Sequence, residues 1–196
     1  MNALTIRKGA SRHSAYDLRN PLGDHKETHT LSVLVDNEAG VLARVIGLFS
    51  GRGYNIDSLT VAETDHEGHL SRITIVTTGT PAVIEQIKAQ LDRIVPVHGV
   101  RDLTVEGPAV RRELALIKVA GTGEKRVEAM RLAEVFRARV VDTTLESFIF
   151  ELTGAPDKVD AFVALMEPLG VVDVARTGVA AIARGKDETL AAHSAA

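Results

Sequence analysis

The feature that most constrains the fold is a strand and helix order that occurs twice along the chain, with a period of about 80 residues. Each half has the order strand, helix, strand, strand, helix, strand. A βαββαβ unit forms a four-stranded antiparallel sheet with both helices on one face. The chain of 196 residues is long enough for two such small domains. We therefore predict an α+β protein made of two ferredoxin-like domains.

In the first half, alternating apolar and polar residues predict strands, and apolar residues at helical spacing predict helices. The second helix has Thr80 at the N-cap and Pro81 at its first position, and it has ended before Pro96. The other expected elements are strands at 30–35, 55–63, 69–78 and 97–105 and a helix at 41–51.

The second half repeats the pattern with different residues. Its first helix, at 124–137, is expected to bury Val127, Met130, Ala133 and Phe136. Pro156 opens the second helix, and Pro168 is expected to stop it. The expected strands are 114–119, one starting at Val140, 148–152, and a last one at 171–183.

These elements predict five segments: a flexible tail at 1–28, a first domain at 29–106, a linker at 107–111, a second domain at 112–185, and a flexible tail at 186–196. The first segment contains Arg and Ser and few acidic residues, which is also typical of an organellar transit peptide. We favour a simple tail, since the segment is short and contains Asp17 and Asp24.

Composition excludes several function classes. The formal net charge of −3 does not favour binding to nucleic acid or to an anionic membrane surface. The absence of cysteine excludes disulfides, thiolate nucleophiles and cysteine-ligated zinc. No apolar run reaches the roughly 20 residues of a membrane span. We expect a cytoplasmic globular protein.

The segment from Asp36 to Leu42 is predicted to be a strand-to-helix turn with a binding role. The start of a helix offers free backbone N–H groups, which suit a carboxylate or a phosphate. Gly40 carries no Cβ that would keep a ligand from the backbone, and the side chain of Asn37 can both donate and accept. The simpler alternative is that Asn37 and Gly40 only satisfy the geometry of the turn.

Asn55 follows the first helix and opens the next expected strand. We expect it to approach the turn of Asn37, so that the two residues hold a small zwitterion. The amides from Gly40 to Leu42 would bind the carboxylate, and the side-chain oxygens of Asn37 and Asn55 would bind the ammonium. Alternatively, both asparagines serve local turns.

The remaining motifs give little support for a specific binding or catalytic site. His66 and His69 lack a third ligand for zinc, and the Gly121-Thr122-Gly123 turn lacks the third glycine and the parallel sheet of a dinucleotide site. Basic residues cluster around the first helix of the second half, which indicates a solvated surface more than a docking site. No catalytic triad or Walker loop is present.

A βαββαβ sheet leaves one face uncovered by its helices. In this chain that face is predicted to be partly apolar, and exposed edges and apolar faces favour pairing. We therefore expect contacts between the halves or between subunits, and a homodimer formed through the first domains.

Several runs closely resemble the small regulatory subunit of acetolactate synthase. The most specific run extends from Arg44 to Leu59 and contains Gly53-Tyr54-Asn55-Ile56. The similarity begins with His29–Val35 and the Asp36–Leu42 turn, continues at Leu70–Ile75, and returns at Asp160–Phe162 and Val174–Val179. It covers about 29–185.

The resemblance implies an N-terminal ACT domain and a non-catalytic, regulatory role. It also implies a partner, the large catalytic subunit, which would carry thiamine diphosphate, Mg²⁺ and FAD, so that no cofactor is expected in this chain. The family's effector is usually valine, bound between two ACT domains. By position, its contacts would be Asn37, Ala39, Gly40, Val41, Leu42 and Asn55.

Three alternatives remain from the topology. A free-standing ACT-type amino-acid sensor acting on another protein would share the loop. An RNA-recognition motif shares the βαββαβ order but needs aromatic residues on its central strands, where this chain has Ile73, Thr74 and Ile75. An acylphosphatase-like enzyme would need an arginine in the turn, and the Asp36–Gly40 turn has none.

Overall fold

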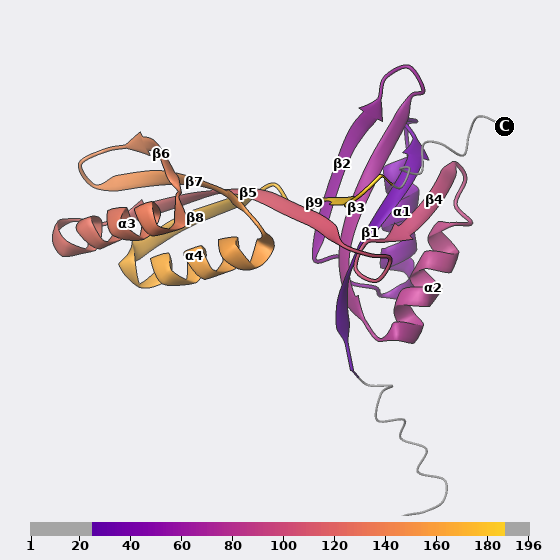
Figure 1. The fold of residues 1–196 in the computed structure, drawn as a ribbon, viewed down its shortest axis with the longest axis horizontal. Helices are drawn as coiled ribbons and strands as arrows, with labels where there is room; N and C mark the ends of the chain where they lie inside the picture. Colours follow the sequence, from indigo (N-terminus) through magenta and orange to yellow (C-terminus); the bar gives the residue numbers. More distant parts are fainter. Residues whose placement is uncertain (1–24, 187–196) are drawn as a thin grey trace, which may run out of the picture.

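The computed structural model describes residues 25–186. The predicted tails lie outside these residues, except for their innermost positions. The described chain forms two α+β domains that lie side by side and are joined by a narrow pair of strands (Figure 1). The predicted fold class is confirmed.

The N-terminal domain has one antiparallel sheet with the strand order β2-β3-β1-β4. The central strand β1 pairs with β3 on one side and with β4 on the other, and Leu31 lies opposite Ile75. Its elements are β1 (Glu27–Asp36), α1 (Val41–Arg52), β2 (Ser58–Asp65), β3 (Leu70–Gly79), α2 (Pro81–Leu91) and β4 (Val97–Asp102).

The core of this domain lies between the sheet and the two helices. Because side chains alternate along a strand, Leu31, Val33 and Val35 all point to the helical side. The helices contribute residues at helical spacing, namely Val41, Val45, Phe49, Ile84, Ile87 and Leu91, each at most 2% exposed. Ile94, just beyond the end of α2, also packs against this core.

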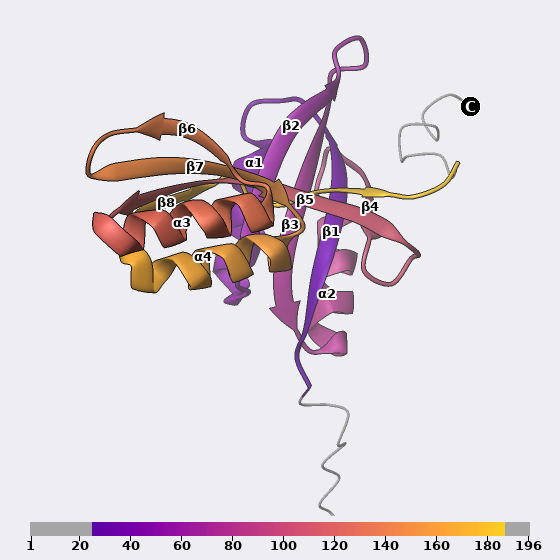
Figure 2. The same cartoon turned by 60° about the vertical axis from the view of Figure 1, so that its left-hand side comes forward.

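The C-terminal domain repeats the topology, with the strand order β6-β7-β5-β8. Helices α3 and α4 lie beside each other on one face of its sheet (Figure 2). Its elements are β5 (Ala109–Ala120), α3 (Gly123–Phe136), β6 (Arg139–Thr143), β7 (Ser147–Gly154), α4 (Pro156–Gly170) and β8 (Val171–Arg176), followed by β9 (Ala180–Ala183).

Two predictions for these helices were wrong. Val127 is 60% exposed, because α3 approaches the sheet through the small residues Ala129 and Ala133, and these turn Val127 toward solvent. Pro168 does not stop α4, which continues to Gly170. A proline so close to the helix end removes a single backbone hydrogen bond, and few residues remain to be disrupted after it.

The last predicted strand, 171–183, is two strands. β8 belongs to the C-terminal sheet, but β9 pairs antiparallel with the first residues of β5, from Ala109 opposite Ala183 to Arg112 opposite Ala180. Residues 109–111 of the predicted linker therefore belong to a strand. We call residues 109–112 together with β9 the bridging ribbon.

The bridging ribbon packs against the N-terminal sheet on the face away from its helices. Leu103, Val179 and Ala181 form a small buried cluster there, with Val76 packed against it. Elsewhere this face is mixed, since Thr30, Ser32 and Thr74 are buried on it together with Leu34, which is 2% exposed. The expected contact between the two halves is thus present, and the face is partly apolar, as predicted.

Hydrogen bonds between β2 and Val179 hold the junction between the domains. Ser58 of β2 accepts a hydrogen bond from the backbone N–H of Val179 at 2.8 Å, and Thr60 donates to the carbonyl of Val179 at 3.0 Å. Within the C-terminal domain, Arg176 donates to Glu113, which is 4% exposed, and to Asp160. The hydrogen bond to Glu113 raises the pKa of Arg176 above its usual value, so the guanidinium stays charged.

Candidate functional site

The turn between β1 and α1 has an open, glycine-dependent geometry. Gly40 is the N-cap of α1 with φ 91° and ψ −10°, a left-handed conformation that L side chains adopt only under strain. A Cβ placed on Gly40 would meet no atom within 4 Å. Glycine is therefore required by the backbone, and the space in front of the turn is free.

The backbone of this turn offers donors to that space. Within residues 25–186, the amides of Ala39, Gly40 and Leu42 donate to no acceptor. The amide of Val41 makes one long bond of 3.4 Å to the carbonyl of Glu38. Free amides at the start of a helix attract an anion such as a carboxylate.

The side chains of the turn divide into a buried anchor and an exposed surface. Val41 is 2% exposed and belongs to the core, so only its backbone faces outward. Asn37, Ala39 and Gly40 are exposed, and Leu42 is 37% exposed. The predicted residues from Asn37 to Leu42 thus form one continuous surface.

Contacts from the β2–β3 hairpin and from the start of β4 hold this turn on both sides. On one side, the amide of Asn37 donates to the carbonyl of His69 at 2.6 Å. On the other, the amide of Asp36 donates to the carbonyl of Pro96 at 3.2 Å, and the carboxylate of Asp36 lies 2.5 Å from Nε2 of His98. Sequence reasoning missed His98, since it stands 62 residues from Asp36 and no local motif marks it among the seven histidines.

Asn55 does not approach this turn within one chain. Helix α1 separates the two asparagines and is about 18 Å long for its 12 residues. The side chain of Thr77 donates to the carbonyl of Asn55, and Thr77 lies opposite His29, near the start of β1, whereas Asn37 follows its end. The predicted approach was wrong because β1 and β2 run parallel, which puts the two ends of the connecting helix at opposite ends of the sheet.

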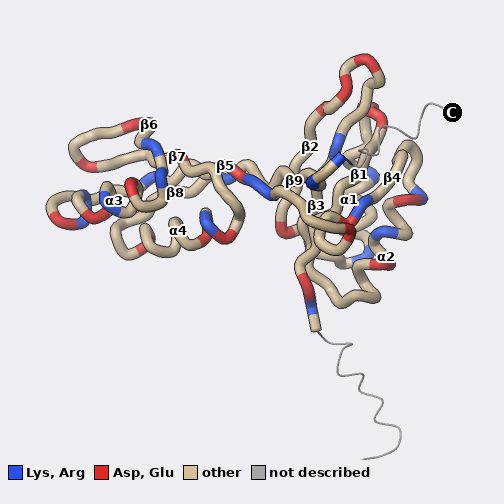
Figure 3. The backbone as a smooth tube through the Cα atoms, in the orientation of Figure 1, with Lys and Arg blue, Asp and Glu red and all other residues tan. Residues whose placement is uncertain are grey.

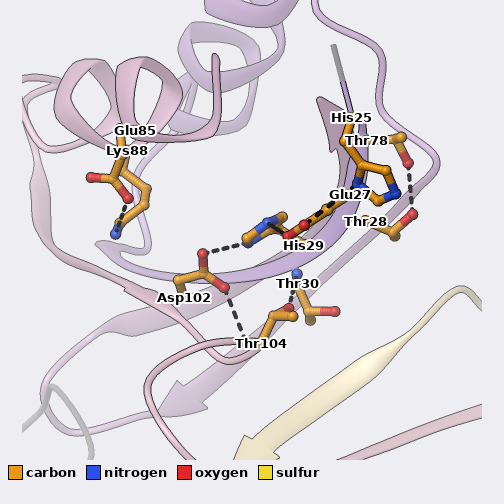
Figure 4. A network of polar contacts seen from close by, with 10 residues as sticks. All are labelled: His25, Glu27, Thr28, His29, Thr30, Thr78, Glu85, Lys88, Asp102 and Thr104. Atoms are coloured by element: carbon orange, nitrogen blue, oxygen red, sulfur yellow. Dashed lines mark hydrogen bonds and ion pairs between the residues drawn. The ribbon is translucent and has the colours of Figure 1, made fainter. Parts of the chain in front are cut away.

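The end of the domain that carries Asn55 has its own polar network. The Asn55 side chain donates to Asp57 at 2.5 Å, and Asp57 accepts a second bond from Thr78. Figure 4 shows the buried part of this end, where Nδ1 of His29 lies 2.7 Å from Asp102. His29 and Asp102 are 5% and 0% exposed, so this pair is part of the interior.

Other candidate chemistry is not supported by the part of the chain that the structure describes. No group of three or more His, Cys, Asp or Glu side chains within residues 25–186 is placed to hold a metal ion. Of the two histidines considered for zinc, His66 pairs with Glu63 on the hairpin surface. In the described part of the chain, no helix is long and apolar enough to cross a membrane.

Charges are mixed over both domains (Figure 3). The basic residues around α3 have local partners: Arg126 stacks on the ring of Phe148 at 3.8 Å, and Arg139 pairs with Glu151. This favours the interpretation of a solvated surface over a docking site for an acidic partner.

Comparisons with known proteins agree across both domains. Residues 31–99 match the family described as "AHAS small subunit-like ACT domain", and residues 112–185 match "Small subunit of acetolactate synthase". The probable acetolactate synthase small subunit of Archaeoglobus fulgidus is 49% identical over 157 residues, which cover 80% of this chain and 97% of that protein. The acetolactate synthase isozyme 3 small subunit of Salmonella typhimurium is 48% identical, over 79% of this chain and 94% of that protein.

A solved structure agrees with these sequence relatives. The crystal structure of the acetolactate synthase small subunit from Thermotoga maritima superposes with a TM-score of 0.72 at 40% identity, covering 82% of this chain and 99% of that chain. Both the sequence and the two-domain architecture are thus shared over nearly the full length of these relatives. The chain belongs to the family of acetolactate synthase small subunits, and its N-terminal domain is an ACT domain.

Proposed function

We propose that this chain raises the activity of the large, catalytic subunit of acetolactate synthase and makes that subunit sensitive to valine. The catalytic subunit would carry the thiamine diphosphate, Mg²⁺ and FAD and perform the condensation. The chain described here would sense the end product of the branched-chain amino-acid pathway.

The observation that carries this proposal is the β1–α1 turn. Its three free amides lie in an exposed turn next to the exposed side chain of Asn37, an arrangement suited to the carboxylate and ammonium of an amino acid. Leu42, partly exposed beside them, offers an apolar contact for a branched side chain. The turn lies in the ACT domain of a family defined by an amino-acid biosynthetic enzyme.

We further propose that the site is completed by a second copy of the chain. Asn37 and Asn55 lie at opposite ends of α1 in one chain, so one small amino acid cannot contact both. In a homodimer with the ACT domains packed side by side in antiparallel orientation, Asn55 of one protomer would face the turn of its partner. A two-fold axis would then create two equal sites.

Valine can inhibit only if it binds one arrangement of this dimer more tightly than another. Couplings between ligand sites are typically about 1–3 kcal/mol, which corresponds to a change of roughly 5- to 150-fold in affinity. A ligand at a dimer interface can produce such a difference, because its contacts depend on how the two domains are oriented.

The direct test mixes this chain with the catalytic subunit and follows acetolactate formation while valine, leucine and isoleucine are titrated. We expect the mixture to be faster than the catalytic subunit alone, and valine to reverse the gain. Asn37→Ala is expected to raise the valine concentration for half-inhibition about tenfold or more, because it removes a contact to the effector. If the chain binds valine but does not stimulate the catalytic subunit, a free-standing sensor becomes the better assignment.

A mixed dimer tests whether the site is shared. If one site uses Asn37 of one protomer and Asn55 of its partner, a dimer of one Asn37→Ala chain and one Asn55→Ala chain keeps one intact site. If both residues served the same protomer's site, the mixed dimer would have none. Calorimetry on the co-expressed, doubly tagged dimer should therefore recover about half of the valine-binding capacity. No recovery would contradict the shared site.

A further inference from the structure

We infer that His98 is a positioning residue for the effector loop, by which we mean residues 36–42. This inference rests on the proposed function, since it concerns how the loop is prepared to bind an amino acid. His98 lies on β4 and touches the loop at one point, the carboxylate of Asp36, with Nε2 and Oδ1 2.5 Å apart.

The loop is held unequally on its two sides. On the β3 side, the bond from Asn37 to the carbonyl of His69 is made by the backbone alone. On the β4 side, one of the two bonds depends on side chains, the His98–Asp36 pair, and the other is the backbone contact between Asp36 and Pro96. Just beyond the loop, the side chain of Arg44 donates to the carbonyl of Val95 at 2.6 Å.

Asp36 is the residue through which a change at His98 would reach the site. Its carbonyl accepts the amide of Glu38 at 2.9 Å, and the next residue in the chain is Asn37. A rotation of Asp36 therefore moves the Asn37 side chain and alters the path into the Ala39 and Gly40 amides. Binding to a loop that adopts its competent conformation only part of the time is weakened by that fraction.

The His98–Asp36 pair also affects the charge at the site. The free amides at the start of α1 would bind a carboxylate, and the Asp36 carboxylate precedes them by only a few residues. With His98 as hydrogen-bond donor, part of that negative charge is compensated. Without it, Asp36 is free to turn toward the amides and compete with the effector for them.

A purely structural role is not expected from this pair. The side chains of His98 and Asp36 are each 35% exposed and lie outside the buried core cluster of the domain. Pairs with such exposure contribute little to the free energy of unfolding. The effect of removing His98 should therefore be seen in effector binding and loop protection, and much less in global stability.

Three substitutions at His98 test whether the loop needs a hydrogen-bond donor at the position of Nε2 or only a polar side chain. Glutamine places its amide nitrogen three bonds from Cβ, as in Nε2 of histidine, whereas the nitrogen of asparagine lies one bond closer, as in Nδ1. We expect His98→Ala and His98→Asn to weaken valine binding to the full-length chain about fivefold. His98→Gln should remain within about twofold of the wild type, because it restores the donor at the same reach.

Arg139 provides the control. It pairs with Glu151 at 3.6 Å and its side chain is 76% exposed, but it lies in the C-terminal domain, which does not carry the loop. Arg139→Ala should leave valine binding unchanged in the same calorimetric titration. Equal affinities for wild type and His98→Ala, or a His98→Gln variant as weak as His98→Ala, would overturn the assignment.

Amide hydrogen exchange without effector distinguishes this inference from the proposed function. His98→Ala should speed exchange at Asp36, Asn37 and Arg44, and His98→Gln should not. If the wild type binds none of the three branched-chain amino acids, the proposed function fails. If it binds valine while exchange at these residues is unaffected by His98→Ala, only the role of His98 fails.

Discussion

The two domains share one sheet order and differ in what covers the sheet on the side away from the helices. In the ACT domain, the bridging ribbon and Leu103 cover part of that face. In the C-terminal domain, the same face carries Leu116, 38% exposed, and the exposed side chain of Lys118. The comparison teaches that the topology does not determine what covers this face, since the bridging ribbon covers part of it in the ACT domain while Leu116 and Lys118 stay exposed in the C-terminal domain.

The loops after the first strand of each domain differ in a related way. In both, the residue after the strand donates its amide to the facing hairpin: Asn37 to His69 and, at 2.9 Å, Gly121 to Glu146. The ACT loop then opens to free space, whereas a Cβ on Gly121 would lie 3.3 Å from the carbonyl oxygen of Leu169. The C-terminal loop is therefore closed at Gly121 by the end of α4, and it is open only further along, at Gly123 in the first turn of α3.

The largest expected loss of stability comes from replacing a glycine. Gly170, with φ 113°, lies so close to β5 that a Cβ would overlap the carbonyl oxygen of Ala120, whereas Gly40 with φ 91° faces open space. Gly170→Ala should lower the free energy of unfolding by about 4 kcal/mol, from strain plus overlap, and Gly40→Ala by about 1 kcal/mol, from strain alone. Urea denaturation measures both, and similar losses would contradict the difference.

A larger side chain under the bridging ribbon should destabilise the ACT domain more than the C-terminal domain. Ala181 is 8% exposed and packs against Leu103, while the next residue, Ile182, is 50% exposed. Ala181→Leu should cost about 3 kcal/mol, because the added atoms overpack the buried cluster, and Ile182→Leu should cost little. Hydrogen exchange should rise in β1 and β3 and stay unchanged in β7.

Removing a charged pair is expected to give a smaller difference in stability between the two domains. Arg176→Ala leaves Glu113 buried without its partner in the C-terminal domain and should cost about 2 kcal/mol, after allowance for the partial exposure of Arg176. Lys88→Ala removes an exposed pair with Glu85 in the ACT domain and should cost at most about 0.5 kcal/mol. Thermal unfolding of the two variants would show equal shifts if burial of the carboxylate were unimportant.

The smallest effect is expected at the junction. Ser58→Ala removes the acceptor of the Val179 amide and should cost about 1 kcal/mol, mainly as loosened contact between the domains. Ser50→Ala, at an exposed position of α1, serves as the control and should cause no loss. Limited proteolysis between β8 and β9 measures the difference, and equal cleavage rates would mean that Ser58 does not hold the junction.

Local signals predicted the repeated topology and one half of the candidate site. Period-two and helical patterns placed the strands and helices, since their buried faces repeat along the chain. Gly40 and Asn37 were identified because turn chemistry is local. The sheet order of a βαββαβ unit also determines that β1 and β2 are parallel, so the separation of Asn37 from Asn55 was within reach of sequence reasoning.

The missed features depend on contacts between distant segments. β9, with the sequence Ala-Ala-Ile-Ala, has no alternation of its own, and its partner on β5 lies about 70 residues earlier. The contact of His98 with Asp36 depends on the pairing of β4 with β1, which no local pattern in the sequence reveals. Val127 was misassigned because apolar character predicted the buried face, whereas small alanines determine how α3 approaches the sheet.

The ACT domain can be completed only after β9 has been synthesised, because the bridging ribbon covers part of its sheet. The ribosome makes Leu103 about 80 residues before Ala183, so at about 5 to 20 residues per second the cover arrives roughly 4 to 16 s late. During that interval Val76 and Leu103 stay uncovered on the nascent ACT sheet. The first domain to be synthesised is thus the last to be completed, and a chain that stalls within α4 leaves it open.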